Sequence, residues 1–390
     1  MRIVDIRETA IPLKSSLANS GFDFSEMTTS VVAVITDAKR DGKPVAGFAF
    51  NSTGRYACGA QMRARFIPRI LAAKPESLLN AAGDNLDPEK ILACMMQREK
   101  PGGHTERSVA IGTIEVAVWD AVAKIAGLPL HRVLAKKYHK NNKLSKIPCY
   151  VGGGWYEPGK GIPALQDEIR AKLDQGYAAM KIKVGGASIP HDLKRVEAAL
   201  KVVKSSGRLA VDANAGFDRG RALAYARALA PYELRWFEEP CDPLDYALLT
   251  DVAHDYSAPL ATGENMFSTQ DVQNLVSYGG LRPDRDILQM DVPQSYGIVQ
   301  FSRTLAMLER RGWKRKSVFP HGGNQMTLHI VGGFGLGGCE AYPGVFGPFA
   351  GFADDARVEN GYLKLPDRPG IGFEGQGKLF EIMRRLSDGG

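Results

Sequence analysis

The stretch Leu209–Glu264 contains LAVD at 209–212, LRWFE at 234–238 and LATGE at 260–264, three short runs rich in apolar residues that each end in an acid. The three final acids, Asp212, Glu238 and Glu264, follow one another at equal intervals of 26 residues. That interval is about the length of one strand, one helix and their loops. The stretch therefore predicts repeated βα units with an acid at the end of each strand.

Similar β-rich runs recur on both sides of this stretch, and eight can be counted. They are residues 147–151, 179–184, 209–212, 234–238, 260–264, 287–291, 318–321 and 334–340. Charged segments that permit helices lie between most of them, such as His191–Val203 and Arg219–Ala230. Strands that alternate with helices indicate a parallel α/β fold, and eight repeats favour closure into a modified TIM barrel, a (β/α)-barrel.

The residues before and after the repeats predict a second part of the fold. Alternating apolar residues at Arg2–Arg7 and Thr28–Thr36 indicate antiparallel strands, with turn residues at Asp37–Gly42. Residues Ser108–Gly127 are apolar nearly all round, which indicates a buried helix. We expect an α+β capping domain at 1–130, the barrel at 131–352 and a C-terminal segment, 353–390, that returns to the capping domain.

Composition narrows the class of protein. The 390 residues contain no apolar run long enough to span a bilayer, and the charged N-terminus does not resemble an export signal, so a cytoplasmic location is expected. The formal net charge of +7 comes from interleaved acidic and basic residues, which argues against a nucleic-acid or membrane partner. Five scattered cysteines show no disulfide or zinc spacing and are interpreted as buried thiols.

The three acids predict a metal site. Strand ends of a barrel meet at one face, so Asp212, Glu238 and Glu264 would converge there, where their mutual repulsion is costly without a cation. Oxygen ligands favour Mg²⁺, which also leaves positions open for a substrate. The alternative, in which each acid only caps the following helix, accounts less well for three acids at equal spacing.

Basic groups follow at neighbouring strand ends. Lys181 and Lys183 alternate along one strand and should point to the same side, where a second cation and a metal would lower a lysine pKa toward that of a general base. Asp291 and His321 end the sixth and seventh runs, so Asp291 could fix the tautomer of His321 and raise its basicity. Glu340 ends the eighth run and could bind a substrate oxygen, or be a plain turn residue. The remaining histidines considered, at 131, 139, 191, 254 and 329, are interpreted as structural.

These residues together resemble the signature of the mandelate racemase subgroup of the enolase superfamily. The matching motifs are Lys181–Lys183, Val211–Asn214, Trp236–Pro240, Thr262–Asn265, Asp291 and His321, and Ala117–Pro129 resembles the capping domain of the same family. The resemblance implies a Lys or His base that works with a magnesium-stabilised ene-diolate, as in that superfamily. The stretches Phe319–His329 and Glu340–Gly344 resemble D-tartrate dehydratases more narrowly.

The resemblance also implies roles for individual positions. Asp212, Glu238 and Glu264 would bind Mg²⁺, and Lys183 would take a proton from an S-configured carbon while Lys181 assists electrostatically. His321, paired with Asp291, would protonate the departing β-hydroxyl so that water leaves. With D-tartrate as the substrate the product would be oxaloacetate.

Contacts that select the substrate are expected mainly in the capping domain. Segments Ala18–Asp23 and Phe50–Gly54 are possible lids, which places Gly21 and Asn51 beside the substrate, although both segments could be ordinary surface turns. Lys100 could supply a cation to the distal end of a dicarboxylate, or be a solvated lysine. Asn214, in the Val211–Asn214 motif, is expected at the substrate as well.

Three other interpretations stay open. The same lysine and histidine could exchange a proton without elimination, as in a racemase or epimerase. Another acid sugar, such as an aldonate or galactarate, is equally compatible with the barrel. A catalytically silent barrel would need a missing acid or base, and none is missing. A small-molecule hydroxy acid is thus the expected partner, and association into a homo-oligomer is usual in the family.

Overall fold

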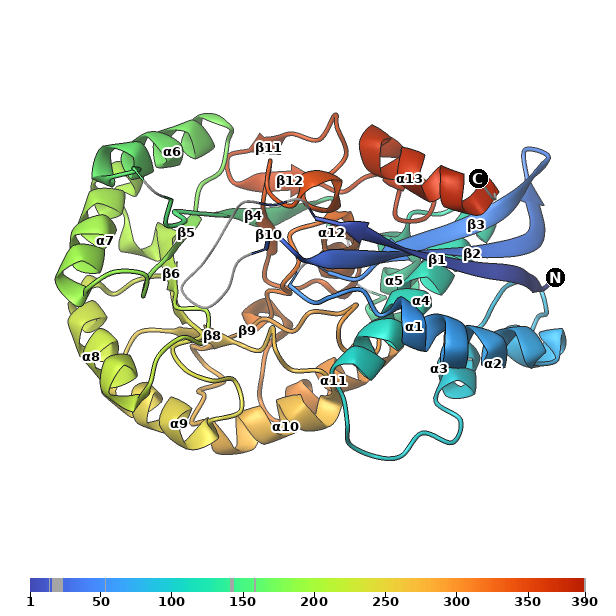
Figure 1. Ribbon diagram of the computed structural model, residues 1–390, viewed down its shortest axis with the longest axis horizontal. Helices are drawn as coiled ribbons and strands as arrows, with labels where there is room; N and C mark the ends of the chain where they lie inside the picture. Colours follow the sequence, from blue (N-terminus) through green and yellow to red (C-terminus); the bar gives the residue numbers. More distant parts are fainter. Residues whose placement is uncertain (14, 16–23, 53, 141–143, 158, 389–390) are drawn as a thin grey trace.

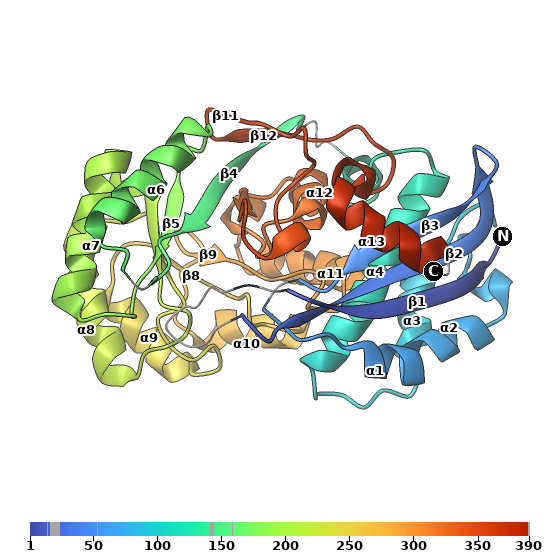
Figure 2. The same cartoon turned by 45° about the horizontal axis from the view of Figure 1, so that its top comes forward.

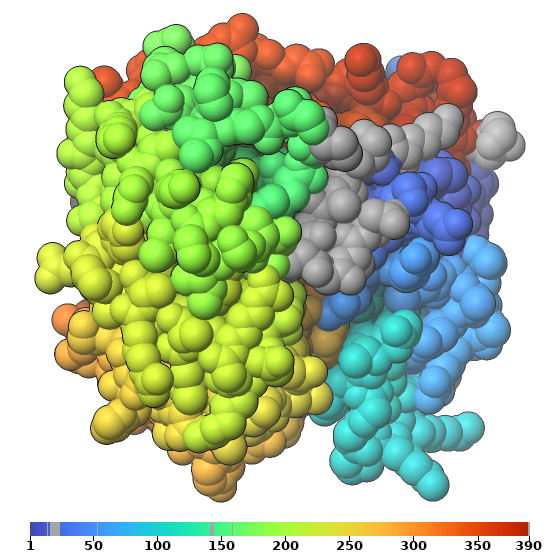
Figure 3. Space-filling model, turned by 60° about the vertical axis from the view of Figure 1, so that its left-hand side comes forward, coloured from blue at the N-terminus to red at the C-terminus, as the bar shows by residue number. Residues whose placement is uncertain are grey.

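The computed structural model describes residues 1–390 except 14, 16–23, 53, 141–143, 158 and 389–390. Two parts lie side by side, a ring of strands surrounded by helices and a smaller α+β part that contains the N-terminus (Figure 1). Figure 3 shows the same two parts from another side, with the barrel in green to yellow and the N-terminal elements in blue to cyan. The predicted fold class, a barrel with a capping part, is confirmed.

An antiparallel sheet forms the core of the N-terminal part, with strand order β1 (Ile3–Pro12), β2 (Thr28–Arg40) and β3 (Lys43–Phe50). The turn was predicted to start at Asp37, but β2 runs to Arg40, because Lys39 and Arg40 still pair with β3. Asp41 and Gly42, both with positive φ, then make a two-residue turn of the kind that suits tight hairpins.

Helical segments follow this sheet along the chain, and the longest of them packs against β2 and β3. They are α1 (Gly59–Gln61), a π-helical turn (Met62–Phe66), α2 (Ile67–Ala72), a 3-10 turn (Pro75–Leu78), α3 (Pro88–Met95), α4 (Glu106–Ile125) and α5 (Leu130–Tyr138). Nearly all of α4 is buried, as its apolar sequence predicted. Gly47 of β3 lets the strand touch α4, since a Cβ there would lie 2.2 Å from the carbonyl oxygen of Ala117.

The barrel strands follow one another in parallel around the ring. They are β4 (Lys146–Gly153), β5 (Met180–Lys183), β6 (Leu209–Asp212), β7 (Phe237–Glu238), β8 (Leu260–Thr262), β9 (Ile287–Leu288) and β10 (Cys339–Ala341), and β10 pairs with β4. The outer helices are α6 (Ile162–Asp174), α7 (Ile189–Val203), α8 (Arg219–Leu229), α9 (Tyr246–Asp255), α10 (Thr269–Tyr278), α11 (Ile298–Arg310) and α12 (Gln325–Phe334). 3-10 turns lie at Ser206–Arg208, Ala230–Tyr232 and Arg315–Ser317.

Two of the predicted barrel strands differ from the sequence pattern. The seventh, Val318–His321, is held beside β9 by a bridge at Val318 and by the N–H groups of Phe319 and His321, which donate to the carbonyl oxygens of Leu288 and Gln289. Pro320 between them has no N–H to donate on the opposite side. The eighth was predicted to begin at Phe334, but Phe334 ends α12, and the left-handed Gly335 terminates that helix. The strand therefore starts only at Cys339.

The C-terminal segment contacts both parts. β11 (Val358–Glu359) and β12 (Tyr362–Lys364) extend the barrel sheet at β4, with a 3-10 turn at Gly347–Phe349 before them and another at Phe373–Gly375 after them. α13 (Gly377–Asp388) then packs along β1 and β2, and the backbone of its last turn accepts hydrogen bonds from Arg7 (Figure 2). The return of the chain to the N-terminal sheet is thus seen in α13, while the domain boundaries at residues 130 and 352 stay predictions.

Within the described ranges of the chain, no helix has the length and apolarity that crossing a membrane would require.

Candidate functional site

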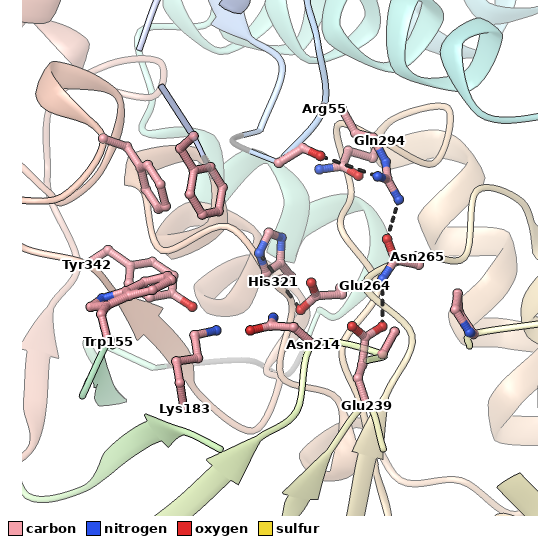
Figure 4. Close-up of a pocket in the computed structure, with 15 residues that line it drawn as sticks. Arg55, Trp155, Lys183, Asn214, Glu239, Glu264, Asn265, Gln294, His321 and Tyr342 are labelled. Carbon is pink, nitrogen blue, oxygen red and sulfur yellow. Dashed lines mark hydrogen bonds and ion pairs between the residues drawn. The ribbon is translucent and has the colours of Figure 1, made fainter. Parts of the chain in front are cut away.

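A cavity of about 270 Å³ lies at the C-terminal ends of the barrel strands, where the N-terminal part covers them (Figure 4). Lys183, Asn214, Glu264 and His321 line it, as predicted. Its other lining residues are Phe24, Gly54, Arg55, Trp155, Ala215, Glu239, Pro243, Asn265, Gln294, Tyr342 and Phe346. The cavity therefore lies at the predicted strand ends and brings four of the predicted site residues together, while their roles stay predictions.

The floor of the cavity is a buried network of charges, which we define as Lys181, Lys183, Asp212, Glu238 and Glu340. Lys183 lies directly beside Asp212 in the β5–β6 register, and Asp212 lies beside Glu238 in the β6–β7 register. The Lys183 Nζ atom is 2.6 Å from Asp212 Oδ2. The Lys181 Nζ atom is 3.3 Å from the same oxygen and 2.7 Å from Glu340 Oε1, and it also contacts Glu238.

Burial and neighbouring charges set the protonation of this network. Burial alone would lower the pKa of Lys181, but Glu238, Glu340 and Asp212 raise it well above its usual range. The predicted lowering of a lysine pKa by a second cation and a metal stays a prediction, since the charged groups that surround Lys181 here are carboxylates. Burial, together with Asp212, Glu340 and Glu264, raises the pKa of Glu238 to about 8, although Lys181 opposes the shift.

His321 and Asp291 pair as the sequence suggested, beyond the ends of their strands. His321 Nδ1 is 2.8 Å from Asp291 Oδ2, and the Nε2 atom lies 3.9 Å from Glu264 Oε2. The backbone N–H of Gln294 donates to the other oxygen of Asp291. Burial would lower the pKa of His321, but Glu264 and Asp291 raise it to about 10. The imidazole is thus held by one nitrogen and presents the other to the carboxylates of the cavity.

Magnesium was predicted at Asp212, Glu238 and Glu264, and the donors fit this ion in kind. All three are carboxylates at neighbouring strand ends, and the Oδ1 atom of Asn214 beside them has no hydrogen-bond partner among the described residues. Besides burial, the charges of Asp212 and Glu264 raise the pKa values of both Glu238 and Glu239. Negative charge is therefore in excess at this place. In the positions described, however, no three Asp, Glu, His or Cys side chains are arranged to hold an ion, because Lys181 and Lys183 occupy the carboxylate oxygens.

The five predicted substrate contacts have different locations. Asn214 lines the cavity and donates to Asp212. Glu340 lies below it, hydrogen-bonded by Tyr342 and paired with Lys181. Asn51 is fully buried, where its amide binds backbone groups and Thr29.

Lys100 and Gly21 are the other two predicted contacts. Lys100 is exposed and does not line the cavity, and Gly21 lies outside the described residues. A role of Glu340, Asn51, Lys100 or Gly21 toward the substrate stays a prediction.

Sequence reasoning missed part of the lining. Four aromatic side chains, Phe24, Trp155, Tyr342 and Phe346, make one wall, and the Lys183 Nζ atom lies 4.7 Å from the centre of the Trp155 ring. Figure 4 shows Trp155 and Tyr342 on the side of Lys183, and Arg55 with Asn265 on the opposite side. The available signal for Arg55 was its place one residue after the suggested lid Phe50–Gly54.

Residues interpreted as structural lie away from the cavity. His131 and His329 contact each other between α5 and α12, and burial lowers their pKa values to about 4 and about 3. All five cysteines are buried and free, as predicted.

Comparisons with known proteins agree with this geometry. The family described as "Enolase C-terminal domain-like" matches residues 164–378, more than half of the chain. A 3,6-anhydro-alpha-L-galactonate cycloisomerase of Streptomyces coelicolor is 30% identical and is aligned over 71% of this chain and 73% of its own length. An L-talarate/galactarate dehydratase of Salmonella typhimurium is 27% identical over 350 residues, which are 88% of this chain and 81% of that protein.

A solved structure has the same architecture. It is that of a racemase from Streptomyces coelicolor with bound magnesium, which is 25% identical, has a TM-score of 0.76, and is matched over 97% of this chain and 99% of its own. The strand-end carboxylates, the paired lysines, the His321–Asp291 pair and these matches lead to one conclusion: the chain belongs to the enolase superfamily.

Proposed function

We propose that this protein is a magnesium-dependent acid-sugar dehydratase, a hydro-lyase that removes a proton alpha to a carboxylate and expels a β-hydroxyl. The observation that carries the proposal is that Lys183 and His321 both line one cavity, with Glu264 beside the histidine. A proton acceptor and a proton donor that face one substrate are what an elimination requires. Several relatives are dehydratases of acid sugars, among them the L-talarate/galactarate enzyme and an arabinonate dehydratase of Saccharolobus solfataricus.

Asp212, Glu238 and Glu264 would hold the magnesium ion. When bound, the ion supplies positive charge that offsets the negative charge developing on the substrate carboxylate. The excess of carboxylates around Glu238 supports this assignment, because a divalent cation relieves their repulsion. Holding the ion at Asp212 would need the contact between Lys183 and Asp212 to be released, and Lys183 would accept the α-proton as a neutral amine, after its ammonium proton has gone to solvent.

Lys183 would take the α-proton. Its Nζ atom reaches the cavity between Asp212 and the Trp155 ring, and the ring shields that side of the amine from water. Lys181 has no such access, since its side chain is 1% exposed and three carboxylates surround it. Lys181 therefore contributes a fixed positive charge and orients Glu238 and Glu340.

His321 would protonate the departing hydroxyl group. Asp291 holds Nδ1, so the proton for transfer is on Nε2, which faces the cavity. In the elimination the α C–H bond and the β C–O bond break, a C=C bond forms, and the hydroxyl leaves as water with the His321 proton. The enol product then tautomerises to a 2-keto acid.

D-tartrate is the substrate we propose within this class, with oxaloacetate as the product, on the resemblance of the 319–329 and 340–344 stretches. A galactarate, talarate or aldonate is the alternative that the relatives favour.

The test is incubation of the purified protein with Mg²⁺ and a panel of mono- and diacid sugars, including the three tartrate stereoisomers, with semicarbazide to trap 2-keto acids. We expect a keto acid from one diacid, with loss of the signal on chelation and in Lys183→Met. The exposed Lys160, which pairs with Glu157 outside this cavity, provides Lys160→Met as the matched control.

If another acid sugar is turned over, the proposed reaction stands, but that acid sugar is the substrate in place of D-tartrate. Exchange of the α-proton with solvent without any keto acid would assign the protein to the racemases and contradict the proposal.

A further inference from the structure

Arg55 brings a guanidinium group from the N-terminal part to the barrel cavity. It lies after β3, at the end of the loop from Asn51, and lines the cavity on the side opposite Lys183 and Trp155 (Figure 4). Its side chain contacts the amide oxygen of Asn265, and the Cζ atom lies 4.9 Å from the centre of the Phe267 ring. The guanidinium group is thus fixed in position by neutral groups of the barrel.

Arg55 is a cation of the cavity that forms no salt bridge with any described residue, although its charge also acts on Glu106 from beyond salt-bridge distance. Lys183 is paired with Asp212, and His321 is paired with Asp291. No carboxylate within the described parts of the chain lies within 4 Å of the Arg55 guanidinium nitrogens, which contact only the Asn265 side chain and the carbonyl oxygen of Gly54. A guanidinium group has five N–H donors in a fork that suits a carboxylate, so most of this donor capacity is unused.

Asn265 is held so that its oxygen faces Arg55. Its Nδ2 atom donates to Glu239 Oε1 at 2.7 Å, and Glu239 is 2% exposed. The amide group therefore separates Arg55 from the Glu239 carboxylate, which would otherwise neutralise it. The chain of contacts orients the guanidinium group and leaves its charge available.

We propose that Arg55 binds the distal carboxylate of a dicarboxylic acid sugar and selects diacids over their monoacid analogues. This inference rests on the proposed function, because Lys183, His321 and the metal site hold the other carboxylate and the reacting carbons. A cavity of about 270 Å³ has room for a short-chain diacid, whose two ends would then meet opposite sides of the lining. Arg55 is accordingly a specificity-determining residue.

The experiment compares substrates that differ only at the distal end. D-tartrate is paired with D-threonate, and galactarate with D-galactonate, since each monoacid has a hydroxymethyl group where the diacid has a carboxylate. Wild type, Arg55→Met and Arg55→Lys are assayed for kcat and KM with Mg²⁺. Arg2→Met is the matched control, because Arg2 is an exposed arginine beside the same sheet that pairs with Asp37 far from the cavity.

We expect Arg55→Met to lower kcat/KM for the diacid about 10- to 100-fold, mainly through KM, which corresponds to the loss of a charged hydrogen bond. The monoacid value should change less than about threefold. Arg55→Lys should recover part of the loss, because it restores the charge without the fork. Equal losses for both members of a pair, or a wild-type preference for the monoacid, would overturn the proposal and make Arg55 a clamp between the loop and Asn265.

Calorimetric binding of D-tartrate and D-threonate to the same variants separates this inference from the proposed function. If no acid sugar is turned over, the proposed function fails, but tighter binding of the tartrate that is lost in Arg55→Met would still support the role of Arg55. Binding of both acids that is unaffected by Arg55→Met, or no binding of either, would contradict it.

Discussion

The floor and the roof of the cavity differ in their types of residue and in the secondary structure that carries them. The floor defined above consists of five charged side chains from barrel strands β5, β6, β7 and β10, none more than 5% exposed. The roof, which we define as Phe24, Gly54, Arg55 and Phe346, comes from loops and is only partly charged. Strands fix the floor residues by register, whereas loop residues are placed by individual contacts. We infer from this comparison that the floor residues determine the proposed reaction and that the roof residues select its substrate.

Lys183 is where the largest effect is expected, because it is the floor residue that reaches the cavity. Lys183→Met should lower turnover by about 10²- to 10⁴-fold, the usual contribution of a general base. The thermal midpoint should change little, since Asp212 retains Lys181 as a partner. Steady-state assays and thermal unfolding of the variant check both parts. Unchanged turnover in Lys183→Met would show that Lys183 is not the general base.

Lys181 should behave in the opposite way, as the cation that holds the floor together. Lys181→Met would leave Glu238 and Glu340 buried without their cation, which costs roughly 3–5 kcal/mol of unfolding free energy. Differential scanning calorimetry of Lys181→Met and Lys183→Met measures the contrast. Equal losses of stability in the two variants would contradict the separate roles of the two lysines.

A contact between helix α4 of the N-terminal part and helix α11 of the barrel is expected to have a pH-dependent effect on stability. Glu115 of α4 accepts hydrogen bonds from the backbone N–H groups of Ile298 and Val299 at the start of α11, and from Trp119. Gly112 permits this contact, because a Cβ there would lie 2.1 Å from the carbonyl oxygen of Pro293. The contact thus lies close in sequence to the segment that carries Asp291 and Gln294.

Burial raises the pKa of Glu115 from 4.5 to about 7, so the folded state retains a proton that the unfolded chain has lost. The stability that this group contributes is present below pH 4.5 and is lost as the pH rises to about 7, with a total on the order of 3 kcal/mol. Glu115→Gln cannot ionise. The difference in thermal midpoint between wild type and Glu115→Gln should therefore shift in favour of wild type from pH 7 to pH 5. A difference independent of pH would contradict the buried titration.

The fold was largely readable from the sequence because strand and helix patterns alternate with a regular period. The floor was readable for the same reason: Lys183, Asp212 and Glu238 each end a strand, and the register places them side by side. Their spacing could not show that Lys181 is paired with three carboxylates, because pairing depends on side-chain positions within the barrel.

The roof could not be predicted in the same way. Phe24, Arg55 and Phe346 lie in loops without periodicity, and their positions result from contacts with residues far along the chain, such as Arg55 with Asn265. Asn51 was expected at the substrate, and its amide binds the backbone N–H of Ser30 in β2 and the carbonyl oxygen of Arg55. Sequence position alone does not distinguish these two uses of a loop residue.

The most direct test of the central claim is proton exchange in His321→Asn. The variant is incubated in D₂O with Mg²⁺ and the acid sugar that wild type dehydrates, and deuterium at the α-carbon and keto acid are both followed by NMR. If Lys183 is the base and His321 the acid, deuterium is incorporated without keto acid in His321→Asn, and neither process occurs in Lys183→Met. Exchange that is lost in His321→Asn but retained in Lys183→Met would contradict the assignment of the two roles.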